Sequence, residues 1–150
     1  MRCSDEETVT RNRIGVPVVE KTYVMIKPDA VSRGQVGRIV QRFEDVGLTI
    51  ERMELGTLTD EQAAANYAEH EGKPFYAGLI SYITSGPVVK MVLSGEGAVT
   101  LARKLMGVTD CAVAAPGTIR GDFGLSIDAN VIHGSDSVES AEREVALFFG

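Results

Sequence analysis

Apolar and polar residues follow two different periods along the chain. The nearly all-apolar run Tyr23–Ile26 is typical of a central β-strand, and the Lys27-Pro28 step ends it because proline cannot continue strand pairing. Farther on, apolar residues recur at i, i+3, i+4 and i+7, which places them on one face of a helix. Two such stripes are Val36, Ile39, Val40 and Phe43, and later Ala98, Leu101, Ala102 and Leu105. Helices are therefore predicted in both halves of the chain.

The segment between the two stripes predicts two strands and two helices. "LTIERMEL" is strand-like, but its apolar phase slips between Ile50 and Met53, which predicts a β-bulge. Thr59 and Gln62 form a capping box that opens the helix "DEQAAANYAEH". A short helix in "PFYAGLISYI" follows, and "GPVVKMVLS" returns as a strand.

The last third of the chain is read as loop, helix and strand. Residues Thr109 to Asn130 are rich in Gly, Ala, Pro and Asp, and a segment of this length predicts a functional loop. Asp136 and Ser137 are expected to cap the helix "VESAERE", and "VALFF" to form the final strand. This order is the split β-α-β pattern of a ferredoxin-like sandwich. We expect an α/β protein, more strictly α+β, with a four-stranded antiparallel sheet and helices on one face.

Composition narrows the class of protein. A chain of 150 residues with 44% hydrophobic and 24% charged residues has the size and balance of one domain. We divide it into a flexible N-terminal arm, residues 1–20, and a single domain, residues 21–150. The net charge of −6 repels nucleic acids and anionic membrane surfaces. No apolar run reaches the length of a membrane span, so we expect a cytoplasmic protein that binds neither nucleic acid nor membrane.

Candidate chemistry comes from polar residues at the ends of the predicted elements. The chain lacks a P-loop and lacks cysteine or histidine pairs at metal-ligand spacing. Arg120 lies between glycines in "PGTIRGDFG", where the backbone can approach a ligand and the guanidinium can bind phosphate through two N–H groups. Lys27 and Arg103, taken singly, are also compatible with ordinary surface positions. The candidate residues are Lys27, Tyr67, Arg103, Thr109, Arg120, Asn130, His133 and Glu144.

His133 is the most specific candidate. A histidine on an extended segment is most often structural, but the neighbours of His133 in "NVIHGSDS" change this interpretation. Gly134 leaves space beside the ring, and Glu144, one helix later, can orient the far ring nitrogen. An imidazole held by a carboxylate can act as a nucleophile. The other histidine, His70, ends an exposed helix and is given no catalytic role.

Five sequence blocks now occur in an order that resembles the nucleoside diphosphate kinase family. They are "VMIKPDAV", "YAEH…KPFY", "ITSGPVV", "PGTIRGDFG" and "NVIHGSDS…E", and the similarity as a whole extends from about residue 21 to residue 149. The resemblance implies a ferredoxin-like fold. It also implies ping-pong transfer of the terminal phosphoryl group from a nucleoside triphosphate, mainly ATP, to a nucleoside diphosphate. The intermediate would be a phosphohistidine, and Mg²⁺ would arrive with the nucleotide.

The resemblance assigns a role to each matching position. His133 would attack through Nδ1, Glu144 would hold the other ring nitrogen, and Tyr67 would lie near Lys27 and the phosphorylated ring. The nucleotide-binding set is Lys27, Arg103, Thr109 and Arg120 at the phosphates, Asn130 at the ribose and Phe75 at the base. Asp136 would reach Mg²⁺ through water. The resemblance further implies a homo-oligomer, with a hexamer favoured and a tetramer possible.

Two other functions are compatible with this fold. One is a binding module that has lost turnover, which the acidic net charge and the intact His133 disfavour. The other is a histidine phosphocarrier, which passes phosphate between proteins and needs no nucleotide pocket. Phe75, Asn130 and the two arginines would have no role in such a carrier.

Overall fold

A computed structural model describes residues 19–150, which form a four-stranded antiparallel sheet in the order β2-β3-β1-β4. The strands are β1 (Val19–Ile26), β2 (Thr49–Gly56), β3 (Val88–Glu96) and β4 (Ile132–Gly134). The α+β class predicted from the sequence is confirmed. Residues 1–18 of the predicted arm lie outside the described residues, whereas Val19 and Glu20 belong to β1. The division into arm and domain stays a prediction.

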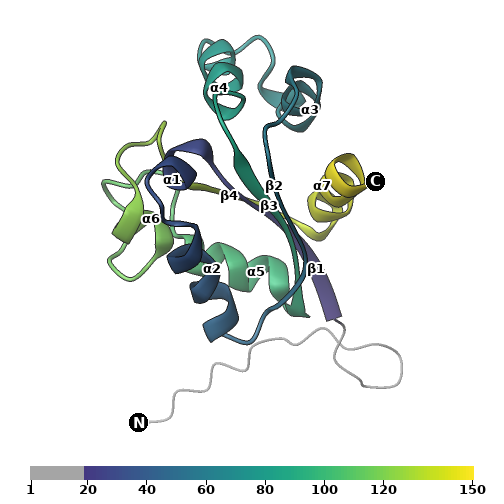
Figure 1. Ribbon diagram of the computed structural model, residues 1–150, viewed down its shortest axis with the longest axis vertical. Helices are drawn as coiled ribbons and strands as arrows, with labels where there is room; N and C mark the ends of the chain where they lie inside the picture. The colour runs from purple at the N-terminus through teal and green to yellow at the C-terminus, as the bar shows by residue number, and fades with distance from the viewer. Residues whose placement is uncertain (1–18) are drawn as a thin grey trace.

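Helices cover both faces of this sheet, so the expectation of helices on one face is wrong. They are α1 (Pro28–Ser32), α2 (Val36–Asp45), α3 (Asp60–Asn66), the 3₁₀ turn η1 (Ala68–His70), α4 (Tyr76–Ile83), α5 (Ala98–Met106), α6 (Ile119–Phe123) and α7 (Val138–Phe149). Figure 1 shows α2 and α5 on one side of the strands and α7 on the other.

The burial of β1 explains why both faces must be covered. Successive side chains of a strand point to opposite faces, and both sets are apolar here. Val24 and Ile26 pack into a core with residues of α2 and α5. Tyr23 and Met25 pack into a second core with residues of α3, α4 and α7. A run that is apolar at every position therefore predicts helices on both sides.

Several local signals were predicted correctly. The register between β2 and β3 shifts at Ile50/Arg52, which confirms the bulge. Both hydrogen bonds of the capping box at Thr59 are present at the start of α3. Gly47 has φ +85° just after α2, a conformation that glycine adopts without steric cost. The Ser137 hydroxyl accepts from the backbone N–H of Ser140 and caps α7.

The end of the chain corrects the predicted strand order. "VALFF" is the last part of α7, and the fourth strand is the three-residue β4. Five apolar residues fit a strand or a buried helix equally, and here Glu144 and Phe148 share the buried face of one helix. Strand β4 pairs antiparallel with β1, and His133 lies opposite Met25.

The segment from Thr109 to Asn130 is mostly irregular and contains only the short α6, so it is a loop, as predicted. Within residues 19–150, no helix is both long enough and apolar enough to span a membrane.

Candidate active site

Nearly all of the predicted residues line one pocket of about 240 Å³ beside β4. They are Lys27, Tyr67, Arg103, Thr109, Arg120, Asn130, His133, Asp136 and Glu144. Phe75 is not in this lining. Its side chain is 51% exposed just before α4, and its ring lies 5.4 Å from the ring of His70, which does line the pocket. Phe75 therefore lies next to the pocket lining rather than in it.

His133 and Glu144 form the central pair of the pocket. The Nε2 atom of His133 is hydrogen-bonded to the Oε2 atom of Glu144 on α7, and Glu144 is only 2% exposed. The other ring nitrogen, Nδ1, makes no hydrogen bond to any residue from 19 to 150. The Tyr67 ring stands edge-on to the imidazole, with ring centres 5.9 Å apart. The carboxylate fixes the orientation of the ring and leaves Nδ1 without a bond to the described part of the chain.

The backbone just before His133 makes a strained turn. Val131 has φ +73°, and the Ile132 N–H donates to the Asn130 carbonyl at 2.8 Å. Together these features define a γ-turn with a left-handed central residue, an unfavourable conformation for a β-branched side chain. The Lys27 N–H donates to the Val131 carbonyl at 2.8 Å, which ties the turn to the end of β1. A turn of this kind persists only where surrounding bonds enforce it.

Arg120 provides further bonds that enforce the turn. Its Nε donates to the Asn130 carbonyl at 3.3 Å and its Nη2 to the Ile132 carbonyl at 2.7 Å, on either side of Val131. Its Nη1 donates to the Gly107 carbonyl at 3.0 Å. The sequence predicted a phosphate contact, but here the guanidinium spans the loop and β4. Two of its five N–H groups make no bond to residues 19–150.

Two cations of the pocket, Lys27 and Arg120, are buried, and Arg103 lies beside them at the surface. Lys27 is 6% exposed, and its Nζ donates to Asn130 Oδ1 at 2.7 Å. Burial, and then the charge of Arg120, lower the pKa of Lys27 to about 8. Burial, and then the charge of Arg103, lower the pKa of Arg120 to about 10. Arg103 on α5 donates to the Gly134 carbonyl at 3.1 Å. Like charges held this close favour the binding of an anion, which offsets their repulsion.

The pKa values of two further predicted residues, Tyr67 and Asp136, are shifted. Burial, and then the negative charge of Glu144, raise the pKa of Tyr67, so its hydroxyl stays protonated. A hydrogen bond from the Ser140 hydroxyl is the main cause of the lowered pKa of Asp136. Asp136 is therefore an anion at the pocket wall.

Sequence reasoning missed several residues of the lining, namely Asn66, Glu69, His70, Gly134, Ser140 and Arg143. His70, for which we predict no catalytic role, also lies in the lining. The position of Glu69 and His70 inside the "YAEH" block was the available signal. Asn66 gave none, because a single polar residue in an alanine-rich helix fits an exposed face equally well.

The fold and the pocket together form the arrangement expected of a phosphotransferase, in which a carboxylate-held histidine lies among cations in an α+β domain. Comparison with known proteins specifies the class. The family model described as nucleoside diphosphate kinase matches residues 20–150. A nucleoside diphosphate kinase of Rhodococcus opacus (strain B4) is 59% identical over 133 residues, which cover 88% of this chain and 96% of that protein.

Solved structures agree with this match. A halophilic nucleoside diphosphate kinase from Halobacterium salinarum, in complex with CDP, superposes with a TM-score of 0.86 at 51% identity over 88% of each chain. The Aquifex aeolicus nucleoside diphosphate kinase has a TM-score of 0.86 at 40% identity, over 89% of this chain and 96% of that one. The chain belongs to the nucleoside diphosphate kinase family. It is an enzyme with the nucleoside diphosphate kinase function, a nucleotide-binding transferase.

Proposed function

We propose that this enzyme works by ping-pong transfer through a phosphohistidine on His133. In the first half-reaction, His133 Nδ1 attacks the terminal phosphorus of a nucleoside triphosphate, mainly ATP, and the bond to the leaving diphosphate breaks. In the second, the terminal oxygen of a nucleoside diphosphate attacks the phosphohistidine and regenerates the ring. The main support is the geometry of one side chain. The Nε2 atom is bonded to Glu144, while Nδ1 makes no bond within residues 19–150, and the ring lines a pocket that also holds Lys27, Arg103, Arg120 and Arg143.

The residues of the lining suit the phosphates of the nucleotide. Lys27, Arg103, Thr109 and Arg120 would bind the phosphates, where the protein's main task is to hold and neutralise the equatorial oxygens. Tyr67, next to the imidazole, would contact Lys27 and the phosphorylated ring. Binding has to redirect Arg120 only in part, because two of its N–H groups are not used by residues 19–150.

The base and ribose would lie outward from the phosphates. Asn130 would contact the ribose, and the half-exposed Phe75 would stack on the base. Stacking on an aromatic ring does not read the edges of a base, so the enzyme would accept many nucleotides. The Halobacterium salinarum protein binds CDP in its crystal structure, and a nucleoside diphosphate is accordingly our proposed ligand here.

Magnesium would enter with the nucleotide. Within residues 19–150, no three Asp, Glu, His or Cys side chains lie together as a protein metal site. Asp136, an anion in the lining, fits a contact through water to Mg²⁺ that the phosphates hold. When bound, the metal would neutralise charge that develops on the phosphates.

We also propose that the enzyme is a cytoplasmic homo-oligomer, a hexamer ahead of a tetramer. Strand β2 is an edge of the sheet, and its Met53 and Leu55 side chains are exposed. An apolar edge strand of this kind invites pairing with a second copy. Sedimentation velocity of the full chain distinguishes the two assemblies, and a monomer at micromolar concentration would contradict the proposal.

The two histidines of the chain allow a direct test of the mechanism. Incubation with ATP and Mg²⁺ alone is expected to give an acid-labile, alkali-stable phosphoprotein that converts added GDP to GTP. His133→Ala should take up no phosphate, and His70→Ala should retain the label. Equal labelling of His133→Ala would show that another residue carries the phosphoryl group.

A further inference from the structure

A group of buried polar atoms surrounds the His133–Glu144 pair. The hydroxyls of Tyr23 and Tyr67 and both amide atoms of Asn66 make no hydrogen bond to residues 19–150. Tyr67 and Asn66 line the pocket, where a ligand can meet them. Tyr23 is fully buried and does not line it. A buried hydroxyl without a partner is unfavourable, so the Tyr23 hydroxyl is expected to have a specific acceptor.

The packing of Tyr23 indicates that this acceptor lies beside Glu144. The Tyr23 ring stacks on Phe148, with ring centres 4.7 Å apart and planes 7° apart. Phe148 follows Glu144 by four residues, one turn farther along the same face of α7. The Tyr23 ring also lies 6.0 Å from the His133 ring. Tyr23 is thus packed between the imidazole and the helix turns that carry the carboxylate.

The charges around Tyr23 are consistent with its place beside Glu144. Three side chains lie around Glu144. They are His133 on β4, Tyr23 on β1 and Tyr67 at the end of α3. Burial is the main cause that raises the pKa of Tyr23 well above its usual range, and the nearby Tyr67 and Glu144 add to the effect. The Tyr23 hydroxyl therefore keeps its proton and remains a donor. The other charged groups of the lining are Lys27, Glu69, His70, Arg103, Arg120, Asp136 and Arg143.

We propose that Tyr23 is a positioning residue for the reaction, whose hydroxyl donates a hydrogen bond to one water molecule that in turn donates to the Glu144 carboxylate. A second donor on the carboxylate fixes its orientation and draws negative charge away from the imidazole. The ring then keeps its proton on Nε2, while Nδ1 binds a second proton less readily. The role of Tyr23 in catalysis rests on the proposed function of His133.

Histidine titration by NMR, without any nucleotide, tests this contact. Tyr23→Phe keeps the ring and its stacking but removes the hydroxyl. We expect the titration midpoint of His133 to rise by about half a pH unit, because Glu144 then attracts the proton of the ring more strongly. The curve of His70 should not move. Tyr76→Phe is the matched control, since Tyr76 packs against the same apolar core. Superimposed His133 curves for the unsubstituted protein and Tyr23→Phe would overturn the proposal.

A second variant separates the hydrogen bond from a general effect on packing. In a Glu144→Gln background, the Tyr23→Phe exchange should shift the His133 titration no further. A shift that persists there does not act through Glu144 and would also overturn the proposal. The phosphorylation rate with ATP and Mg²⁺ should then fall about threefold at pH 6 and less than twofold at pH 8 in Tyr23→Phe. Because the titration needs no phosphoryl transfer, its result is independent of whether His133 carries the phosphate.

Discussion

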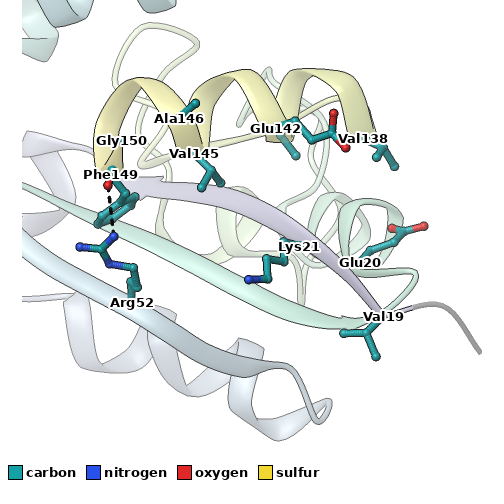
Figure 2. A pocket seen from close by; sticks show the side chains of 11 residues that line it. Val19, Glu20, Lys21, Arg52, Val138, Glu142, Val145, Ala146, Phe149 and Gly150 are labelled. Carbon is teal, nitrogen blue, oxygen red and sulfur yellow. Dashed lines mark hydrogen bonds between the residues drawn. The ribbon is translucent and has the colours of Figure 1, made fainter.

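Helix α7 separates two hollows of opposite chemistry. One is the pocket of His133, of about 240 Å³, into which Glu144 points. The other, the α7 groove, is larger, at about 630 Å³, and its lining is mostly apolar (Figure 2). The α7 groove is lined by Val19, Glu20, Lys21, Arg52, Val138, Ala141, Glu142, Val145, Ala146, Phe149 and Gly150. The smaller hollow is the one that can do chemistry, so size does not identify the site.

The two hollows differ most in the burial of their charged side chains. In the α7 groove, Arg52 is half-exposed, stacks on the Phe149 ring at 4.6 Å and donates to the Phe149 carbonyl at 3.2 Å. In the pocket, Arg120 is 6% exposed beside other cations. Burying like charges together costs stability, whereas an exposed arginine costs little. A buried arginine such as Arg120 therefore indicates a functional site better than the volume of a hollow does.

The largest effect that separates the two hollows should come from His133. His133→Ala removes the proposed nucleophile, so kcat should fall by at least about a thousandfold while far-UV circular dichroism stays unchanged. His70→Ala should reduce kcat by less than about tenfold, since His70 lines the pocket without holding the phosphoryl group. The measurement is steady-state exchange from ATP to GDP. Full turnover by His133→Ala would remove the mechanism.

The two arginines provide the next contrast. Arg120→Lys keeps the charge but loses the bonds on both sides of Val131, so kcat/KM should fall by about a hundredfold or more. The free energy of unfolding should fall by about 1–3 kcal/mol. Arg52→Lys in the α7 groove should change neither quantity beyond about twofold and about 0.5 kcal/mol. Kinetics and urea unfolding measure both, and equal effects of the two exchanges would contradict the distinction.

Two lysines of the β1 region differ in their expected pH dependence. The pKa of Lys27 is lowered to about 8, so the free enzyme should lose kcat/KM above about pH 8, approaching tenfold per pH unit. Lys21→Met in the α7 groove should leave this profile unchanged. The free energy of unfolding should change in the opposite direction and rise with pH. The protonated form of Lys27 is disfavoured by folding, so its cost is present below about pH 8 and is relieved as pH rises towards the usual lysine pKa.

Stability measurements complete that test. Lys27→Met should abolish the part of the rise in unfolding free energy above about pH 8 that Lys27 causes. The difference between the curves of the unsubstituted protein and Lys27→Met isolates this part from other titrating groups. A kcat/KM profile that stays flat to pH 10 would show that the charge of Lys27 is not required.

The smallest effect on activity is expected from Val145, the neighbour of Glu144 on α7. Val145 lines the α7 groove and packs at the edge of the second core. Val145→Ala should reduce the free energy of unfolding by about 1 kcal/mol and leave kcat/KM within about twofold. Thermal unfolding and exchange kinetics provide the measurements. A tenfold loss of kcat/KM would show that the groove and the pocket are coupled through the helix.

Local sequence signals predicted much of this fold. The end of β1 at Lys27-Pro28, the apolar stripes of α2 and α5, and the capping box at Thr59 each depend on residues close together in the chain. The helix formed by "VALFF" was missed because a short apolar run has no period that separates strand from buried helix. The three-residue β4 is too short to show any period. The second helical layer was missed as well, although the apolar run of β1 indicated it.

The sequence identified most residues of the pocket lining, but it did not indicate the geometry that brings them together. His133, Glu144 and the cations were candidates from the residues themselves, and the pocket brings them together, whereas Phe75, assigned by the resemblance, lies outside the lining. The γ-turn at Val131 had no signal, because its angle depends on bonds from Lys27 and Arg120, which are distant in sequence. The same is true of the stacking of Tyr23 on Phe148. Such contacts belong to the assembled molecule rather than to any short segment.

The γ-turn at Val131 also links the orientation of the His133 ring to the folding of the whole domain. Its torsion angle is maintained by β1 on one side and by α6 on the other, through Lys27 and Arg120. A nascent or partly denatured chain lacks those restraints and relaxes to an ordinary extended conformation at this position. Such a chain presents the His133 ring without a defined direction, so we expect it to use nucleotide only after the domain has folded.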